Sequence, residues 1–181
     1  MDNMIKMVVT DLDGTILNHE RKILPKTEEY LLELKSRGYI LVIATGRNFA
    51  SAKKHTNGAK FANYLISDGG ACIYIPDTEE GLVKNIIPKQ KAEEVLSYWN
   101  EDVEFLQMTT KEEYVKYTGE EKQDFLSRIG EIAHIAIKMR DNAKTEELYE
   151  KLEHGFSDLN VLLMQDSFKE DKSIVLTLKG V

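Results

Sequence analysis

The sequence lacks the features that mark secreted, membrane-spanning or nucleic-acid-binding proteins. One of its 181 residues is a cysteine, Cys72, so no disulfide can form within the chain. No apolar run approaches the roughly 20 residues that a membrane-spanning helix needs. Lysine and arginine number 24 against 31 acidic residues, and the formal charge of −7 argues against a nucleic acid or an anionic membrane surface as the main partner.

Proline and glycine are also scarce, at 3 and 11 residues, which excludes fibrous and low-complexity classes. A chain of this length forms one ordinary domain or two small ones and is long enough to bury a core. Its first residues, Met1 to Met4, lack the basic region and the apolar stretch of a secretion signal. We therefore expect a globular, cytoplasmic protein.

What is present in the first half is an alternation of strand and helix patterns. Met4 to Val9 and Tyr39 to Ala44 are mostly apolar and β-branched, which is typical of parallel strands covered on both faces. Pro25 to Gly38 predicts a helix between them, because proline stands near its first turn and glycine just past its end. Asn48 can cap a second helix that reaches about Asn57. The pattern predicts an α/β fold of the Rossmann-like kind.

The alternation ends in shorter elements. Tyr64 to Ile66 predicts a third strand, which turns at Asp68-Gly69-Gly70 into Ala71 to Ile75. A short strand from about Leu82 to Ile87 follows, and we expect a domain boundary near residues 84–88. This divides the chain into a first domain, 1–85, and a second domain, 86–181.

The second domain has the pattern of an α+β sandwich with helices on one face of a half-buried sheet. Lys89 to Asn100 predicts an amphipathic helix with a packing stripe that ends at Trp99. Two more helices are expected around Phe125 and around Leu148. Four strands are expected at Val103 to Met108, His134 to Met139, Val161 to Gln165 and Ile174 to Leu178.

Polar residues follow the first two predicted strands. Asp11 and Asp13 come after the first strand and Thr45 after the second. Ligands of an open parallel sheet bind beyond the carboxyl ends of its strands, so these side chains should converge. Two carboxylates two residues apart can offer oxygen ligands to one Mg²⁺ ion, and Gly14 lets the chain approach a ligand closely. The ion would also offset the charge of an incoming phosphate.

Such a group of residues can perform phosphoryl transfer. One carboxylate can attack phosphorus, a second can protonate the leaving oxygen and later activate water, and the Thr45 hydroxyl can hold a phosphoryl oxygen. Alone, Asp11 to Thr15 could be an ordinary polar turn after a strand. Its glycine stands at the wrong position for a calcium-binding loop.

Asp11-Leu12-Asp13-Gly14-Thr15 after an apolar strand resembles the first motif of the haloacid dehalogenase-like hydrolase superfamily, and Ala44-Thr45-Gly46-Arg47 resembles the second motif of its Cof-type phosphatases. The resemblance implies an aspartyl-phosphate on Asp11, Asp13 as general acid and base, and Thr45 as phosphoryl ligand. It implies that Mg²⁺ binds the Asp11 side chain and the Asp13 carbonyl, that the loop residues Gly14, Gly46 and Arg47 contact the substrate, and that the second domain is an α+β cap. The implied substrate is a small phosphorylated metabolite.

The sequence also departs from the family pattern. Asp68-Gly69-Gly70-Ala71 stands where Asn-Gly-Ala is common, which would add a negative charge near the phosphate pocket. The third motif supplies a lysine and the fourth a glycine-aspartate, and no glycine-aspartate pair occurs in this sequence. Lys179 could be the lysine, although we expect it to belong to the last strand. The chain therefore resembles a partial Rossmann-like core and cap, truncated before those motifs, and we expect weak activity or none.

Other interpretations stay open. Arg47 contacts either the substrate or a structural ion-pair partner, and Asp68-Gly69-Gly70 is more often a simple turn. His19, His55, His134 and His154 show no metal-ligand spacing, and Cys72 is expected in the core. The chain could be a non-catalytic binding module in which the acids are a relic, or a phosphomutase of the same superfamily. A signalling receiver domain is disfavoured because Thr45 stands where its phosphorylated aspartate would be. Neither the substrate nor the oligomeric state is indicated.

Overall fold

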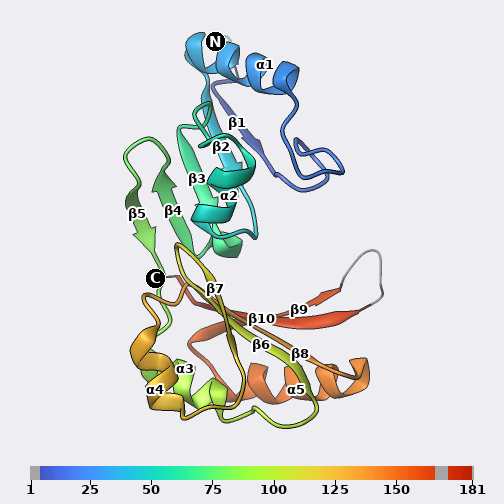
Figure 1. Cartoon of the computed structure of the whole chain (residues 1–181). Coiled ribbons are helices and arrows are strands. Elements are labelled where there is room, and N and C mark those ends of the chain that lie inside the picture. Colours follow the sequence, from blue (N-terminus) through green and yellow to red (C-terminus); the bar gives the residue numbers. More distant parts are fainter. Residues whose placement is uncertain (1–4, 166–170, 181) are drawn as a thin grey trace. The chain divides into compact units, whose positions relative to one another are not determined.

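The computed structural model describes residues 5–165 and 171–180, arranged in two compact units that divide between Lys84 and Asn85 (Figure 1). Unit 1 comprises Met1–Lys84 and unit 2 comprises Asn85–Val181. Within the described residues, no helix is both long enough and apolar enough to cross a membrane.

Unit 1 contains a five-stranded sheet in the order β1-β2-β3-β4-β5. Its strands are β1 (Met7–Thr10), β2 (Ile40–Ala44), β3 (Tyr64–Ser67), β4 (Cys72–Ile75) and β5 (Glu80–Lys84). The first three are parallel, and β4 and β5 are antiparallel to their neighbours. The predicted parallel α/β sheet is confirmed, although β5 begins two residues before the expected strand. Met4, the first residue of the expected first strand, lies outside the described residues.

Two helices connect the parallel strands, as the local sequence predicts. Helix α1 (Pro25–Ser36) begins with proline in its first turn, and α2 (Phe49–His55) is capped by Asn48, whose side chain accepts a hydrogen bond from the Ser51 N–H at 2.8 Å. Both helices lie on the same face of the sheet. Phe49 of α2 packs on Tyr74 of β4 with ring centroids 4.7 Å apart, and Asn57, just past α2, donates to Glu28 of α1 at 2.9 Å.

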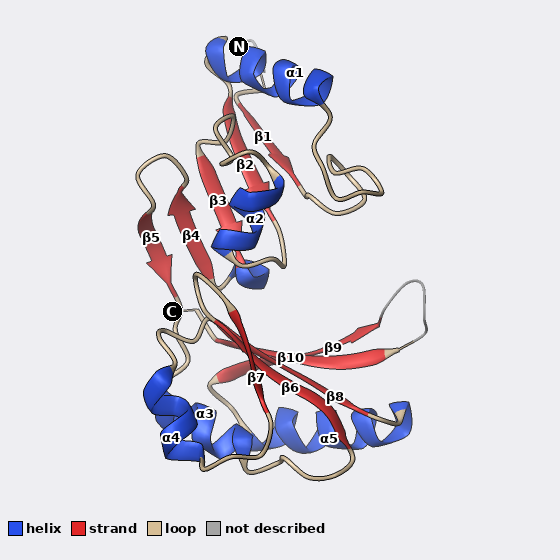
Figure 2. Cartoon of the chain, in the orientation of Figure 1, coloured by secondary structure: helices blue, strands red, loops and turns tan. Residues whose placement is uncertain are grey.

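Unit 2 is a two-layer α+β sandwich, in which helices cover one face of an antiparallel sheet (Figure 2). The sheet order is β7-β6-β8-β10-β9. The strands are β6 (Val103–Thr109), β7 (Tyr114–Tyr117), β8 (His134–Met139), β9 (Leu159–Gln165) and β10 (Lys172–Leu178). The helices are α3 (Lys89–Leu96), α4 (Lys122–Arg128) and α5 (Asn142–Gly155). The expected α+β architecture is confirmed.

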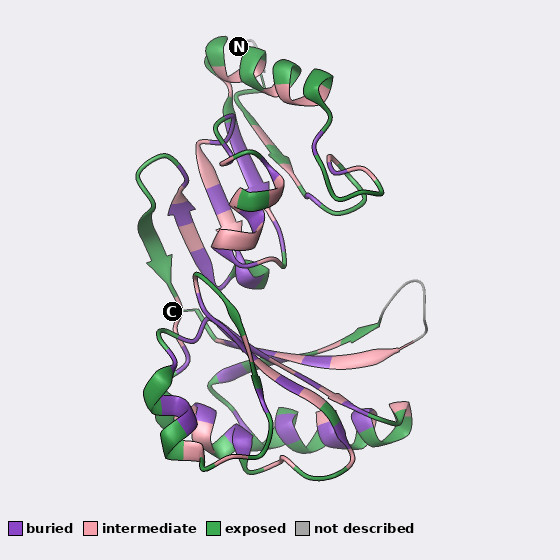
Figure 3. Cartoon of the chain, viewed as in Figure 1, coloured by how far each residue is buried: buried purple, intermediate pink, exposed green. Residues whose placement is uncertain are grey.

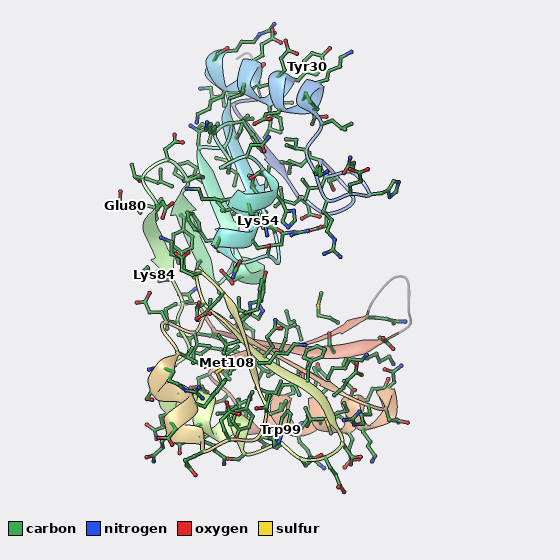
Figure 4. All side chains as sticks on the ribbon, viewed as in Figure 1. Tyr30, Lys54, Glu80, Lys84, Trp99 and Met108 are labelled. Atoms are coloured by element: carbon green, nitrogen blue, oxygen red, sulfur yellow. The ribbon has the colours of Figure 1, made fainter. Side chains whose placement is uncertain are left out.

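Alternating residues of the unit 2 sheet point into its core. Leu106, Ile137 and Ile174 occupy one register across β6, β8 and β10, and each is 0% exposed. Trp99 packs against this core and meets Tyr117 edge to face at 5.3 Å, so the expected packing role of the helix stripe is confirmed. Figure 4 labels Trp99 and Met108 within this unit.

Two details of unit 2 differ from the sequence-based expectations. Helix α3 ends at Leu96 rather than near Asn100, and the N–H groups of Tyr98 and Trp99 instead bond to carbonyls three residues back. Strand β7 was not expected, because its sequence Tyr-Val-Lys-Tyr is too short and too polar to stand out. It is ordered by pairing with β6 over four residues, which is a tertiary effect.

Candidate functional site

The loop after β1 is folded around a single buried carbonyl. Leu12 is 0% exposed, and its carbonyl oxygen accepts hydrogen bonds from the N–H groups of Thr15, Ile16 and Leu17 at 3.0 to 3.3 Å. Gly14 has a φ of +75°, a conformation that side chains with a Cβ rarely adopt, and no heavy atom lies within 4 Å of where a Cβ would stand. The turn therefore leaves Asp11 and Asp13 exposed on either side of buried Leu12.

The loop after β2 lies against the end of β3. Thr45 is 7% exposed, and its N–H donates to the Ile66 carbonyl at 3.0 Å. Its hydroxyl oxygen accepts a hydrogen bond from the Arg47 N–H at 3.2 Å, which orients the side chain at the start of the loop. Gly46 between them is exposed. In register, Thr10 pairs with Ile43, so the residues that follow β1 and β2 leave the sheet at the same edge.

Arg47 joins the two loops through a bidentate ion pair with Asp13. Its Nε donates to Asp13 Oδ2 at 2.7 Å and its Nη2 to Asp13 Oδ1 at 2.6 Å. The arginine side chain is 13% exposed and the aspartate side chain 51%. The Arg47 hydrogen bonds lower the pKa of Asp13 below its ordinary 3.8, although partial burial acts in the opposite direction. Arg47 was expected either to contact the substrate or to form a structural ion pair, and in this structure it forms the ion pair.

Ser51 is a further hydrogen-bond partner of Arg47, and the sequence did not predict this contact. Arg47 Nη1 donates to Ser51 Oγ at 3.2 Å, one turn along α2. The only signal in the sequence was the spacing of four residues, which places two side chains on the same face of a helix. Such spacing is too common to identify a functional pair by itself.

Asp11 differs from Asp13 in its surroundings. Across residues 5–165 and 171–180, no hydrogen bond or ion pair is made by its side chain. The carboxylate of Asp11 and the main-chain carbonyl of Asp13 are hard oxygen donors of the kind that Mg²⁺ prefers. The Asp13 carboxylate is held by Arg47. The described part of the chain contains no group of three or more His, Cys, Asp or Glu side chains that could hold a metal ion. A Mg²⁺ ion fits here only with ligands from elsewhere, such as water and a substrate phosphate.

Asp68 is buried beside the second loop. It is 0% exposed, its N–H donates to the Arg47 carbonyl at 2.9 Å, and its carboxylate accepts a hydrogen bond from the Ser67 hydroxyl at 2.7 Å. The next residue, Gly69, donates its N–H to the Thr45 carbonyl at 3.3 Å. The turn is therefore more than a link between β3 and β4, because its backbone holds both ends of the Thr45-Gly46-Arg47 loop.

The remaining candidates belong to other elements of the two units. Cys72 is fully buried in β4, as expected of a core residue. Lys179, which was expected in the last strand, follows the end of β10 by one residue and donates to the Ser157 carbonyl at 2.7 Å. His134 is buried in unit 2 and shares a hydrogen bond with Thr109 at 2.9 Å, while His19 and His154 are exposed.

Comparison with known proteins shows similarity over most of the chain. A family model described as haloacid dehalogenase-like hydrolase matches residues 8–175. The HMP-PP phosphatase of Serratia proteamaculans (strain 568) is 31% identical over 100 residues, which are 55% of this chain and 36% of that protein. The phosphoglycolate phosphatase of Methanopyrus kandleri is 34% identical over 76 residues, 42% of this chain and 33% of that protein.

A solved structure extends the likeness in fold to nearly the whole chain. The crystal structure of a haloacid dehalogenase-like hydrolase from Bacteroides thetaiotaomicron superposes with a TM-score of 0.76 at 20% sequence identity, covering 98% of this chain and 73% of that one. At this identity the comparison concerns the fold. The chain spans about a third of the length of the curated relatives that it matches, with 36% and 33% of the two named above.

Proposed function

Because this chain belongs to the haloacid dehalogenase-like hydrolases, as the match over residues 8–175 shows, we propose that unit 1 carries the nucleophile side of a Mg²⁺-dependent phosphomonoesterase site. In this proposal unit 1 is part of the catalytic core and unit 2 is the cap. The substrate is a small phosphorylated metabolite, in keeping with the phosphatase names of the relatives. No nucleic acid or membrane is involved, and a cytoplasmic location stays a prediction.

The observation that carries the proposal is the contrast between the two acids. The Asp11 carboxylate is exposed and makes no described interaction, so it can reach an incoming phosphorus atom. The Asp13 carboxylate, two residues away, accepts two hydrogen bonds from the Arg47 guanidinium at 2.6 and 2.7 Å. Paired acids whose surroundings differ in this way are suited to different roles, one as nucleophile and one in proton transfer.

The reaction begins with Asp11. Its carboxylate oxygen attacks phosphorus, the bond from phosphorus to the leaving oxygen breaks, and Asp13 gives that oxygen a proton. Water then attacks the aspartyl-phosphate and passes a proton to Asp13, so that the phosphorus bond to Asp11 breaks and inorganic phosphate leaves. A Mg²⁺ ion held by the Asp11 carboxylate and the Asp13 carbonyl would neutralise charge on the phosphoryl oxygens. The Thr45 hydroxyl binds one of those oxygens.

The ion pair sets a condition on this sequence of steps. In the described geometry Arg47 keeps Asp13 ionised, which suits a base but not an acid. A phosphate dianion offers the guanidinium an alternative bidentate partner. In our proposal Arg47 moves from Asp13 to the substrate, together with contacts from Gly14 and Gly46, and so frees Asp13 to carry a proton.

The test compares Asp11→Asn with the unchanged chain for Mg²⁺-dependent hydrolysis of p-nitrophenyl phosphate. We expect the substitution to reduce turnover to the uncatalysed level, because an amide cannot form the aspartyl-phosphate. Binding of beryllium trifluoride, followed by ¹⁹F NMR, reports on the same carboxylate even where turnover is slow. Asp124→Asn, an exposed acid on α4, serves as the matched control. Turnover that persists in Asp11→Asn contradicts the assigned nucleophile.

One observation favours a second function, that of a non-catalytic binding module. The described residues present two acids at this edge without a third metal-binding side chain, and one of the two is occupied by Arg47. A module of this kind would bind neither Mg²⁺ nor beryllium trifluoride in titration calorimetry. A phosphomutase of the same family would pass the binding test but transfer the phosphoryl group to a second substrate hydroxyl, which product analysis detects.

A further inference from the structure

The loop between β1 and α1 has a defined shape, although most of its residues are exposed (Figure 3). Leu17 and Ile23 in its two arms are buried and pair with each other through an isolated bridge. Between them the chain reverses over residues 18–22, which we call the 18–22 turn. The Asn18 side chain accepts hydrogen bonds from two N–H groups of this turn at 2.9 and 3.0 Å, so the turn is held by its own contacts.

Arg21 in this turn has a strained backbone conformation. Its φ is +58°, in the left-handed region that residues with a Cβ rarely adopt. Strained residues of this kind persist only where surrounding contacts hold them, and they cluster at active sites and ligand-binding sites. Here the contact comes from α2, because the His55 ring Nδ1 donates a hydrogen bond to the Arg21 carbonyl at 2.9 Å. The 18–22 turn is therefore joined to the last residue of α2.

Arg21 and His55 both keep polar atoms available for a ligand. Across residues 5–165 and 171–180, the Arg21 guanidinium makes no hydrogen bond or ion pair, whereas its neighbour Lys22 pairs with Glu20 at 3.1 Å. A carbonyl oxygen only accepts hydrogen bonds, so Nδ1 of His55 carries a proton. Its Nε2 makes no hydrogen bond in the same part of the chain, and in the charged ring it is a second donor. A guanidinium and an imidazole on adjoining elements are suited to binding one anion.

Both of these side chains lie near the acids of the candidate site. Ser51 and His55 are one turn apart on α2, and Ser51 accepts a hydrogen bond from Arg47, which also holds Asp13. The hydrogen bonds of Arg47 are the largest cause of the lowered Asp13 pKa, and the charges of Arg21 and His55 add to it. Coulombic attraction falls with distance, so both groups are close to that carboxylate. In a chain with a formal charge of −7, three basic side chains therefore gather around one acid.

We infer that Arg21 and His55 form a second anion subsite, which binds a carboxylate or a second phosphate group at the other end of the substrate. Arg21 offers such a group two parallel N–H donors, and His55 offers one through Nε2. The substrate class is then a phosphomonoester whose alcohol part carries an anionic group of its own. The inference rests on the proposed function, because it takes the reacting phosphoryl group to bind beside Asp11 and Arg47.

The experiment uses the full 181-residue chain and phosphonates, which cannot be hydrolysed. The probes n-butylphosphonate, ω-carboxybutylphosphonate and tetramethylene bisphosphonate share one carbon chain but end in a methyl group, a carboxylate and a second phosphonate. Dissociation constants come from NMR titration, which also detects weak binding. The constant should be at least tenfold lower for the better two-anion probe than for n-butylphosphonate, because charge-assisted hydrogen bonds are added. The two-anion probe that binds more tightly identifies the second group as carboxylate or phosphate.

A matched pair of variants locates the subsite. Arg21→Gln and Lys22→Gln each remove one positive charge from the 18–22 turn, but Lys22 is already paired with Glu20. We expect Arg21→Gln to weaken binding of the two-anion probe at least fivefold and to leave n-butylphosphonate binding unchanged, whereas Lys22→Gln leaves both unchanged. His55→Asn keeps a donor near the Arg21 carbonyl but removes Nε2, and it should also weaken only the two-anion probe.

Equal affinity of the unchanged chain for one-anion and two-anion probes overturns the inference. Equal losses in Arg21→Gln and Lys22→Gln also overturn it, because they indicate a general attraction between charges. The preference for two-anion probes should persist in Asp11→Asn. A chain that keeps this preference but still turns over substrate in Asp11→Asn retains the subsite and loses the proposed nucleophile, so the two proposals fail separately. Amide shifts outside the loop should be unchanged in each variant, which confirms that the chain stays folded.

Discussion

The two sheets of this protein have five strands each and carry their helices on one face, yet their other faces are chemically different. On the face of the unit 2 sheet away from its helices, one register row is polar and contains Thr109, His134, Thr177 and Asn160, of which Thr109, His134 and Thr177 are buried. The next row contains Lys116 and Gln107 beside Ala136, Val175 and Leu162. The registers of the unit 1 sheet on the face away from α1 and α2 are mostly apolar from Met7 to Val83, with Glu80 opposite Ile75 at the β5 edge. A half-buried antiparallel sheet tolerates water on its polar side, whereas a sheet with two apolar faces needs a layer on each.

The two units also differ in how completely they bury their apolar residues. Unit 2 gathers 22 buried apolar residues into one cluster, from Ile87 to Leu176. In unit 1, α1 contributes no fully buried residue at all, and Tyr30 and Leu32 are 56% and 42% exposed. Most of the free energy that holds a helix in place comes from burying an apolar face. Helix α1 should therefore be less stable than the helices of unit 2.

The largest expected effect contrasts a covered apolar residue with an uncovered one. Leu106→Ala in the unit 2 core should lower the free energy of unfolding by about 2 to 5 kcal/mol, because it removes buried methyl groups and leaves a cavity. Met7→Ala, at a side chain of the unit 1 sheet that is 50% exposed, should change it by no more than about 0.5 kcal/mol. Urea titration monitored by Trp99, the single tryptophan, follows unit 2, and NMR follows unit 1. Equal losses in the two variants would show that Met7 is buried in solution.

A smaller effect concerns helix capping. The Asp141 side chain accepts hydrogen bonds from the N–H groups of Ala143 and Lys144 at the start of α5, whereas Leu24 at the start of α1 provides no side-chain cap. Asp141→Ala should destabilise unit 2 by about 1 kcal/mol. Glu150→Ala, an exposed site on the same helix, is the control and should stay within about 0.5 kcal/mol in the same urea titration.

The pH dependence of unit 1 should report on the Arg47–Asp13 pair. Since the pKa of Asp13 is lowered in the folded state, the pair stabilises unit 1 at pH values above the ordinary pKa of 3.8, and this contribution disappears as the pH falls through the lower, folded value. Arg47→Ala should raise the Asp13 pKa toward 3.8. The variant should then no longer show the loss of unit 1 stability that protonation of Asp13 causes at acid pH. Carboxyl ¹³C shifts measure the pKa directly. An unchanged Asp13 titration in the variant would contradict the ion pair in solution.

The smallest expected effect is that of Ser51→Ala. It removes the hydroxyl that accepts a hydrogen bond from Arg47 Nη1 but keeps the Ser51 N–H that Asn48 caps. Unit 1 should lose no more than about 1 kcal/mol, since a single neutral acceptor is lost at a partly exposed site. Amide shifts should change around Arg47 and Asp13 and stay unchanged in unit 2. A change in unit 1 stability as large as that of Leu106→Ala would mean that the serine has a larger structural role than the one described.

Much of the fold could be predicted from local patterns in the sequence. The Pro25 helix start, the Asn48 cap and the parallel β1 and β2 are confirmed, because proline geometry, side-chain capping and apolar runs act within a few residues. Strand β7 could not be predicted, since its order comes from pairing with β6. In the same way, Ser51 offered no sequence signal for its contact with Arg47 beyond its spacing.

By itself, the sequence determined which residues follow the ends of β1 and β2, because strand pattern and turn chemistry place Asp11, Asp13 and Thr45 at one edge of a parallel sheet. Only the tertiary structure decided that Arg47 pairs with Asp13 rather than Asp11. The two residues of this pair are 34 positions apart in the sequence, so their contact depends on how two loops meet. It also decided which apolar residues are left uncovered. Hydrophobicity shows that Met7 and Val9 could be buried, but whether they are depends on the layers that pack against their face.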